Sequence, residues 1–242
     1  MFEEFIEGLI FFIVYFVIAA TLIFAVKSLL KPHREIVRKL MHTVCFLSIF
    51  VLTEAFETWY LAAGTCILFA LVIYPLLYFA ERHPKYGNLF NQRRPGEVRE
   101  SLLLVFLMMA FLVSVFWGIH GEQWKFIVIT AVLAWGFGDA SAAFAGKKYG
   151  RHCVQNKYVE NCKTWEGTFA MYLVSTIVIF ISLYFYSHLT WYVGLLVAMV
   201  VAVFSAMSEL VSHQGKDTIT VPLATALPLF LLMYVIVNSG IV

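Results

Sequence analysis

Charged residues are scarce in this chain, and their scarcity limits what the protein can be. Asp, Glu, Lys and Arg make up 13% of the 242 residues, and 62% are hydrophobic. Soluble domains typically carry about 25% charged residues. The shortage, together with a mean hydropathy of +0.84, excludes an ordinary water-soluble fold. It predicts an all-α polytopic membrane protein, because helices satisfy their own backbone hydrogen bonds in lipid.

The chain also has only four cysteines, and it lacks a nucleotide-binding loop of the Walker type. The four cysteines show no C-x-x-C spacing, so neither a disulfide framework nor a zinc site is indicated. We expect Cys153 and Cys162 to stay reduced in a cytoplasmic loop. No stretch fits G-x-x-x-x-G-K-[ST], and no repeat or long linker is visible. The sequence therefore predicts one transmembrane domain over residues 1–242, with no nucleic-acid partner.

Long apolar runs predict about eight membrane-spanning helices, most of them near the roughly 20 residues that cross a bilayer. They cover Phe5–Val26, Leu40–Thr53, Trp59–Ala80, Ser101–Gly118, Trp124–Phe144, Gly167–Ser187, Thr190–Glu209 and Ile219–Asn238. The second run is short unless its helix begins earlier, near Ile36. The first run has an acidic flank, so we expect it to be retained as a span and not cleaved as a signal peptide.

The distribution of Lys and Arg predicts the orientation of these spans. Of the 17 basic residues, all but Lys125 lie on one side of the predicted spans. That side holds the loops at about residues 27–39, 81–100, 145–166 and 210–218. By the positive-inside rule it is cytoplasmic, and with eight spans both termini lie outside.

Ionisable residues within the predicted spans, or within a few positions of their ends, gather at the same cytoplasmic level. They are Arg38, Lys39, His42, Asp139, Lys163, Glu166, Glu209 and Asp217. Ionisable groups in membrane helices are costly and by default indicate a functional site. Asp139 is the most unusual of them, because it lies between apolar turns without a basic residue four positions away.

Most of these residues also have a plainer interpretation. Arg38 and Lys39 would serve equally as membrane anchors, and His42 as a boundary histidine. Glu166 would complement its helix dipole, and Asp217 would be an N-cap. Glu209 would be a solvated helix end.

Glycines and lysines follow Asp139 in the stretch "GDASAAFAGKKYG". Gly138, Gly146 and Gly150 would allow either close helix packing or close approach of a ligand to the backbone. Lys147 and Lys148 can meet phosphates. The helix start at "CKTWEGT", which contains Gly167, would offer N–H groups to an anion. An acid for a metal beside lysines and a helix start is typical of phosphoryl or nucleotidyl transfer.

Four motifs, in order along the chain, resemble those of the CTP-dependent polyprenol kinase family, which includes dolichol kinase, phytol kinase and CTP-dependent diacylglycerol kinase. They are "RKLMH", "GDASAAFAGKKYG", "KTWEGTFAM" and "SELVSHQGKDTITVPL". In the last motif Thr218 occupies a position where the family has Asn.

The resemblance implies an enzyme that transfers the γ-phosphoryl group of CTP, with Mg²⁺, to a polyprenol- or phytol-type alcohol. The lipid would lie between helices, with its hydroxyl at the cytoplasmic boundary. Asp139 would hold Mg²⁺, helped by Glu209 or Asp217. The other implied roles fall into two sets. The nucleotide would be held by Arg38, Lys39, Gly138, Gly146, Lys147, Lys148, Gly150, Lys163 and Gly167, and the alcohol's proton would pass to His42, Glu166 or Asp217.

Three alternatives stay open at this point. The acceptor could be diacylglycerol, or the reaction could be that of a phosphatidate cytidylyltransferase, whose later D-R-x-D signature has no counterpart here. A transporter would instead place polar groups near the bilayer midplane, often with inverted repeats. The oligomeric state is not indicated by the sequence.

Overall fold

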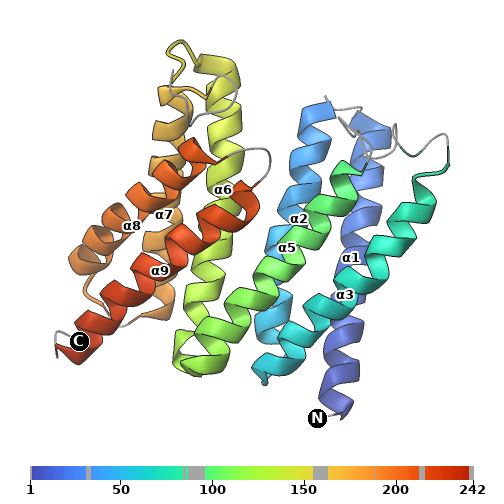
Figure 1. Cartoon of the computed structure of the whole chain (residues 1–242), viewed down its shortest axis with the longest axis horizontal. Helices are drawn as coiled ribbons and strands as arrows, with labels where there is room; N and C mark the ends of the chain where they lie inside the picture. The colour runs from blue at the N-terminus through green and yellow to red at the C-terminus, as the bar shows by residue number, and fades with distance from the viewer. Residues whose placement is uncertain are drawn as a thin grey trace. The chain divides into compact units, whose positions relative to one another are not determined.

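A computed structural model describes residues 2–30, 34–83, 86, 96–154, 163–187, 189–212 and 216–239 (Figure 1). Its helices are α1 (Phe2–Leu30), α2 (Arg34–Glu54), α3 (Trp59–Ala80), α5 (Glu97–Leu112), α6 (Lys125–Tyr149), α7 (Trp165–Tyr186), α8 (Trp191–Val211) and α9 (Asp217–Asn238). A π-helical segment, Val113–Ile119, continues α5, and a 3₁₀ turn, Glu122–Trp124, precedes α6. Within the described residues the only β-type pairing is an isolated antiparallel bridge between Cys153 and Thr164.

The prediction of an all-α polytopic membrane protein is confirmed. Within the part of the chain that the structure describes, eight helices are long and apolar enough to cross a membrane. The third has the predicted bounds, Trp59–Ala80, and the second begins at Arg34, close to the suggested start near Ile36. α6 extends to Tyr149, so Lys147 and Lys148 lie in its last turn.

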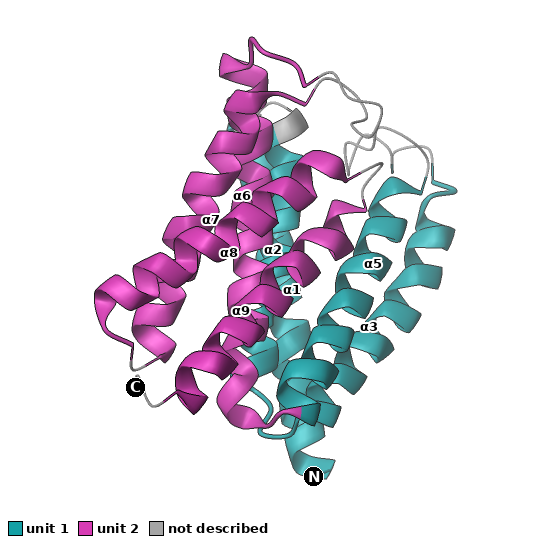
Figure 2. Ribbon diagram, turned by 60° about the vertical axis from the view of Figure 1, so that its left-hand side comes forward, with its two compact units in different colours: residues 1–119 teal, residues 120–242 magenta. Residues whose placement is uncertain are grey.

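The chain divides into two compact units, residues 1–119 and 120–242, coloured separately in Figure 2. In unit 1, α3 packs on α5 and α1 packs on α2. Four aromatic rings from α1, α3 and α5 form its central cluster: Phe12, Phe16, Phe69 and Phe106, with ring centroids 4.8–5.9 Å apart. Rings of this size fix helices at a distance that smaller side chains would not.

The acidic start of α1 has a structural task in unit 1. Oε1 of Glu4 accepts hydrogen bonds from the backbone N–H groups of Glu57 and Thr58, each at 3.1 Å. These donors lie just before α3, where the first N–H groups of a helix lack partners inside the helix. Glu4 therefore ties the first helix to the beginning of the third.

Unit 2 is a set of four helices in which each helix packs on its neighbour in the chain. α7 packs on α6 and α8, and α9 packs on α8 and α6. Every residue from Phe126 to Gly136 of α6 is buried, which indicates a helix enclosed by protein on all sides. Between α8 and α9, the hydroxyl oxygens of Ser205 and Thr225 lie 2.7 Å apart in a buried hydrogen bond. These contacts hold α6, α7, α8 and α9 together in one unit.

Candidate functional site

The contact between α6 and α7 is made through glycines, and we call it the glycine seam: Gly138, Gly146, Gly150 and Gly167. A Cβ atom added at Gly167 would lie 2.9 Å from the backbone oxygen of Ala142 and 3.5 Å from Cα of Gly146. One added at Gly138 would lie 2.4 Å from Sδ of Met171. Of the two interpretations of these glycines, close helix packing is the one that the structure displays. Their contact with a nucleotide stays a prediction.

Thr164 packs against the seam beside Gly146 and Gly150. It is the N-cap of α7, and its hydroxyl accepts a hydrogen bond from the N–H of Gly167 at 3.2 Å. A Cβ at Gly150 would lie 2.6 Å from Cγ2 of Thr164. The N–H of Trp165 donates to the carbonyl of His152 at 3.1 Å. The expectation of unused N–H groups at this helix start is therefore wrong for Trp165 and Gly167.

The segment between α6 and α7 is closed by backbone pairing where its two limbs meet. The N–H of Val154 donates to the carbonyl of Lys163 at 2.8 Å, next to the bridge between Cys153 and Thr164. Cys153 is disulfide-bonded, so the expectation of a reduced thiol is wrong at this position. The backbone pairing draws the two limbs together, which suits a cross-link there. Cys162, the other cysteine that was expected to be reduced in this loop, lies outside the described residues.

Asp139 and the two lysines lie along the second half of α6. Asp139 is half-buried and next to the seam residue Gly138. Ser141 donates to the carbonyl of Gly138 at 2.7 Å, within the same helix. Lys147 and Lys148 are exposed in the last turn, and Nζ of Lys148 lies 5.2 Å from the ring centroid of Tyr149. Cations at this end of a helix also stabilise its dipole, by typically 0.3–1 kcal/mol.

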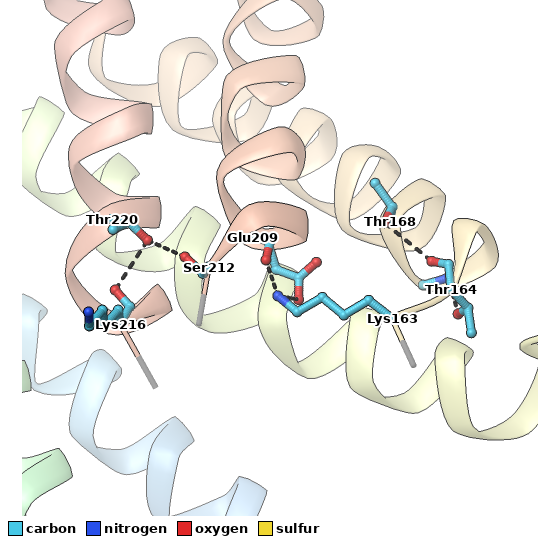
Figure 3. Close-up of polar contacts among 8 residues, drawn as sticks. Lys163, Thr164, Thr168, Glu209, Ser212, Lys216 and Thr220 are labelled. Atoms are coloured by element: carbon cyan, nitrogen blue, oxygen red, sulfur yellow. Dashed lines mark hydrogen bonds and ion pairs between the residues drawn. The ribbon is translucent and has the colours of Figure 1, made fainter. Parts of the chain in front are cut away.

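Lys163 and Glu209 form an ion pair that joins the start of α7 to the end of α8. Nζ of Lys163 lies 3.0 Å from Oε1 of Glu209 and also donates to the backbone carbonyl of Glu209. Figure 3 shows the extended lysine side chain reaching the last turn of α8. Both side chains are largely buried, with 22% and 13% of their surface exposed. In this state the charges of Lys163 and Glu209 neutralise each other. From the sequence, we instead expected Lys163 to contact phosphates and Glu209 to hold Mg²⁺.

Asp217 begins α9, six positions after the last residue of α8. The N-cap of α9 is Lys216 and Asp217 is the first helical residue, so the N-cap interpretation of Asp217 is wrong. Its charge nevertheless lies at the positive end of the helix dipole. The hydroxyls of Ser212 and Thr220 bond to each other, and Thr220 bonds to the carbonyl of Lys216 at 3.1 Å (Figure 3). Thr218, the departure from the family pattern, is buried.

Glu166 pairs with His152, which lies in the connection between α6 and α7. Nδ1 of His152 lies 2.7 Å from Oε1 of Glu166, and the histidine is 75% exposed. The pair joins the beginning of this connection to the first turn of α7. Glu166 is thus positioned by the connection as well as by its helix.

The three early candidates, Arg38, Lys39 and His42, lie in unit 1. Nη1 of Arg38 lies 3.4 Å from Oε1 of Glu97, which begins α5. Arg38 and His42 line a cavity together with Glu97 and Ser101, whereas Lys39 does not. The structure therefore places the candidates of α6–α9 in unit 2, where Lys163 contacts Glu209, and it places Arg38 and His42 in one cavity lining with Glu97 and Ser101. Sequence reasoning missed Glu97 and Ser101, although their spacing of four residues repeats that of Arg38 and His42.

A divalent cation could be held by carboxylates of unit 2. No group of three or more His, Cys, Asp or Glu side chains is arranged for a metal among the residues that the structure describes. Mg²⁺ needs only one or two carboxylates when phosphate oxygens and water complete its shell. Asp139, which is half-buried, is one candidate ligand, and Glu209, whose carboxylate contacts Lys163, is another.

The chain is similar to a phytol kinase of Synechocystis sp., with 36% identity over 167 residues. The match covers 69% of this chain and 63% of the relative. The resemblance to the polyprenol and phytol kinase family, first indicated by the motifs, is confirmed by this relative. No family model matches the chain, and no solved structure matches it.

Proposed function

We propose that this chain, as a relative of phytol kinase, is an integral-membrane kinase that phosphorylates a lipid alcohol. The observation that carries the proposal is the 36% identity to phytol kinase over 69% of the chain. The geometry of unit 2 supports it, because a carboxylate, three lysines and a helix start lie on four mutually packed helices. The proposed donor is CTP, as the family resemblance implies.

The charged end of the glycine seam binds the triphosphate in this proposal. Lys147 and Lys148 project from the last turn of α6, and Lys163 precedes α7. Their ammonium groups offset the charge that the phosphates carry in the transition state, which is the main catalytic contribution in phosphoryl transfer. The seam glycines keep α6 close to the beginning of α7. This proximity would let Lys163 and the two lysines of α6 contact the same triphosphate.

Asp139 is the proposed ligand of Mg²⁺, with Glu209 and Asp217 as further candidates. When bound, the cation would offset the negative charge that develops on the phosphate oxygens. Binding at Glu209 would require its carboxylate to share or leave Lys163. Release of Lys163 from this ion pair would make its ammonium group available to the phosphates.

The reaction forms a bond between the alcohol oxygen and the γ-phosphorus and breaks the bond from that phosphorus to the bridging oxygen. The products are a lipid phosphate and CDP. The alcohol proton passes to a base, for which His42, Glu166 and Asp217 are candidates. Glu166 is held by His152 at 2.7 Å, so its carboxylate has a fixed position before substrate binds.

The test is an assay of purified protein in nanodiscs with γ-labelled CTP or ATP. Acceptors are phytol, geranylgeraniol, a dolichol-type alcohol, an undecaprenol-type alcohol and diacylglycerol. We expect label transfer from CTP to an isoprenoid alcohol. Phosphatidate with α-labelled CTP is the control for a cytidylyltransferase, which would yield a labelled liponucleotide and pyrophosphate. Lack of lipid phosphate with every acceptor would refute the kinase assignment.

A further inference from the structure

Unit 1 contains a cavity of about 410 Å³ among α1, α2, α3 and α5. Its lining follows one stripe of each helix: Ile13 to Phe24, Arg38 to Cys45, Phe69 to Leu77 and Glu97 to Val105. Ile13 and Phe24 are 11 positions apart, which is about 16 Å along a helix. Small-molecule pockets measure roughly 300–1,000 Å³, so this cavity is large enough for a ligand and belongs to the smaller ones.

The cavity is polar at one end and apolar along the rest of its length. Arg38 and His42 are four residues apart near the start of α2, and Glu97 and Ser101 repeat that spacing at the start of α5. Residues four apart share one face of a helix. The remaining lining consists of aliphatic and aromatic side chains with Cys45. A molecule that fits this lining has one polar head and one apolar chain.

We infer that this cavity binds the acceptor substrate, a single-chain lipid alcohol, with its hydroxyl between Arg38, His42, Glu97 and Ser101. The inference rests on the proposed function and names where the acceptor binds and which residues hold it. Glu97 is assigned as a positioning residue for the hydroxyl, since its carboxylate lies at the polar end and can accept the alcohol's hydrogen bond. The hydrocarbon chain lies along the faces of α1 and α3.

The charges at the polar end favour a neutral head group over an anionic one. Glu97 lies 3.4 Å from Arg38, so the guanidinium already has a counter-ion. A phosphate head group entering here would meet the Glu97 carboxylate, and like charges at short range repel. A hydroxyl both donates and accepts, and can therefore bond to Glu97 and to Ser101 or His42 together. An alcohol fits these groups better than phosphatidate does.

The dimensions of the cavity favour one chain over two. A chain lying along the 16 Å stripe of α1 passes Phe16 and Phe69, two rings of the central cluster of unit 1. These rings are stacked, with centroids 4.8 Å apart, and their packing limits the width of the cavity at this level. Diacylglycerol would need room for two chains side by side. We therefore expect an unbranched or isoprenoid single chain to be preferred.

The direct test is photo-crosslinking in nanodiscs with phytol that carries a diazirine at the chain end remote from the hydroxyl. We expect crosslinks on the cavity faces of α1 and α3, near Ile13 and Phe69, identified by mass spectrometry. Excess unlabelled phytol should suppress them, whereas diacylglycerol or phosphatidate should not. Crosslinks confined to other residues, or suppressed equally by phosphatidate, would overturn the inference.

A matched pair of variants tests the same cavity through turnover. Ile13 lines the cavity at the end remote from the polar groups, and Ile18 is an exposed residue of the same helix that does not line it. Ile13→Trp should raise the KM for a long isoprenoid alcohol at least tenfold, with a smaller effect for a short one. Ile18→Trp should leave both values near those of the unaltered protein. Equal chain-length profiles in the two variants would contradict the inference.

The polar end is tested by Glu97→Gln, alone and with Arg38→Gln. If Glu97 bonds the hydroxyl, the single variant should raise the KM for the alcohol several-fold with little change in the KM for CTP, and the double variant should not recover. Recovery in the double variant would show that Glu97 only balances the charge of Arg38. Crosslinking without turnover would refute the kinase assignment alone, and turnover without cavity crosslinks would refute the acceptor site alone.

Discussion

The glycine seam of unit 2 and the cavity of unit 1 are opposite results of helix packing. In the seam, α6 and α7 approach until a single added Cβ would contact backbone, as at Gly167. In unit 1, side chains as large as Phe16 and Phe69 keep the helices apart and leave about 410 Å³ open. The glycines therefore fix α6 against α7 at close range, whereas the large residues of unit 1 leave a space that could hold a lipid. The proposed phosphate-binding region is thus built with small residues, and the proposed lipid-binding region with large ones.

The proposed function requires the polar end of the cavity and the lysine-bearing end of α6 to face the same side of the membrane. Arg82 and Lys148 are exposed at the ends of α3 and α6, and Glu3 and Thr190 are exposed at the opposite ends of helices in the same two units. We expect cysteines at Glu3 and Thr190 to react with an impermeant maleimide in intact cells. Cysteines at Arg82 and Lys148 should react only after permeabilisation, because the positive-inside rule places them in the cytoplasm.

The unaltered protein is the control in this labelling experiment, since Cys45 is half-buried and Cys66 is buried. Labelling of Arg82→Cys and Lys148→Cys under opposite conditions would place the two polar ends on opposite sides. One active site could not then use both.

Asp139→Asn should have the largest effect on turnover, because it removes the charge proposed to hold Mg²⁺ at the seam. We expect a loss of at least about a hundredfold, the ~2.7 kcal/mol scale of one electrostatic contact to a transferring group. The variant should fold normally, since neutralising a carboxylate near lipid relieves a desolvation cost. Steady-state kinetics and thermal unfolding in detergent measure the two quantities.

A purely structural Asp139 would give a different pattern. If it pairs with a buried base, its replacement should cost roughly 3–5 kcal/mol of stability and lower expression. A well-folded variant with near-normal turnover would refute the metal assignment.

Two glycine substitutions compare the packing of the units directly. Gly167→Ala places a methyl group 2.9 Å from the carbonyl of Ala142, and overpacking of this kind typically costs about 1–3 kcal/mol. Gly64→Ala in α3 has no atom within 4 Å of the new methyl, so the better helix propensity of Ala should stabilise the protein by up to ~1 kcal/mol. Opposite shifts in Tm are expected, and shifts of the same sign would contradict the packing difference.

Glu209→Gln should have the smallest effect, because the Gln amide oxygen can still accept a hydrogen bond from Lys163, whose ammonium group also donates to the backbone carbonyl of residue 209. We expect a loss of about 1 kcal/mol in stability and a few-fold rise in the Mg²⁺ concentration needed for half-maximal activity. Lys163→Met is the matched control, since it removes the same pair but leaves the carboxylate in place. An unchanged Mg²⁺ dependence for Glu209→Gln would make the pair structural and exclude Glu209 as a ligand.

Hydropathy and charge predicted the helices well, because crossing a bilayer imposes a length and an apolar composition on each one. The bounds of α3 were predicted to the residue, and the other helices differ mainly at their ends. The π-helical segment Val113–Ile119 was not predicted. It depends on a local change in hydrogen bonding that an apolar run does not reveal.

The site was predicted less completely, because its contacts join residues far apart in the sequence. Lys163 and Glu209 were both identified, but their ion pair joins positions 46 apart. Glu97 was overlooked because it lies in a basic loop by sequence, and its importance follows from its contact with Arg38. The cavity depends on how faces of four helices fit together, which no single periodicity encodes.

The cavity also has a place in the order of synthesis. All its lining residues lie between Ile13 and Val105, so the ribosome has made every one of them before α6 begins. The glycine seam requires Thr164 and Gly167, which follow much later in the chain. Because domains generally fold from the N-terminus during translation, unit 1, which is proposed to bind the lipid, would fold before unit 2. A bilayer alcohol could then meet the growing protein before the parts that handle the nucleotide exist.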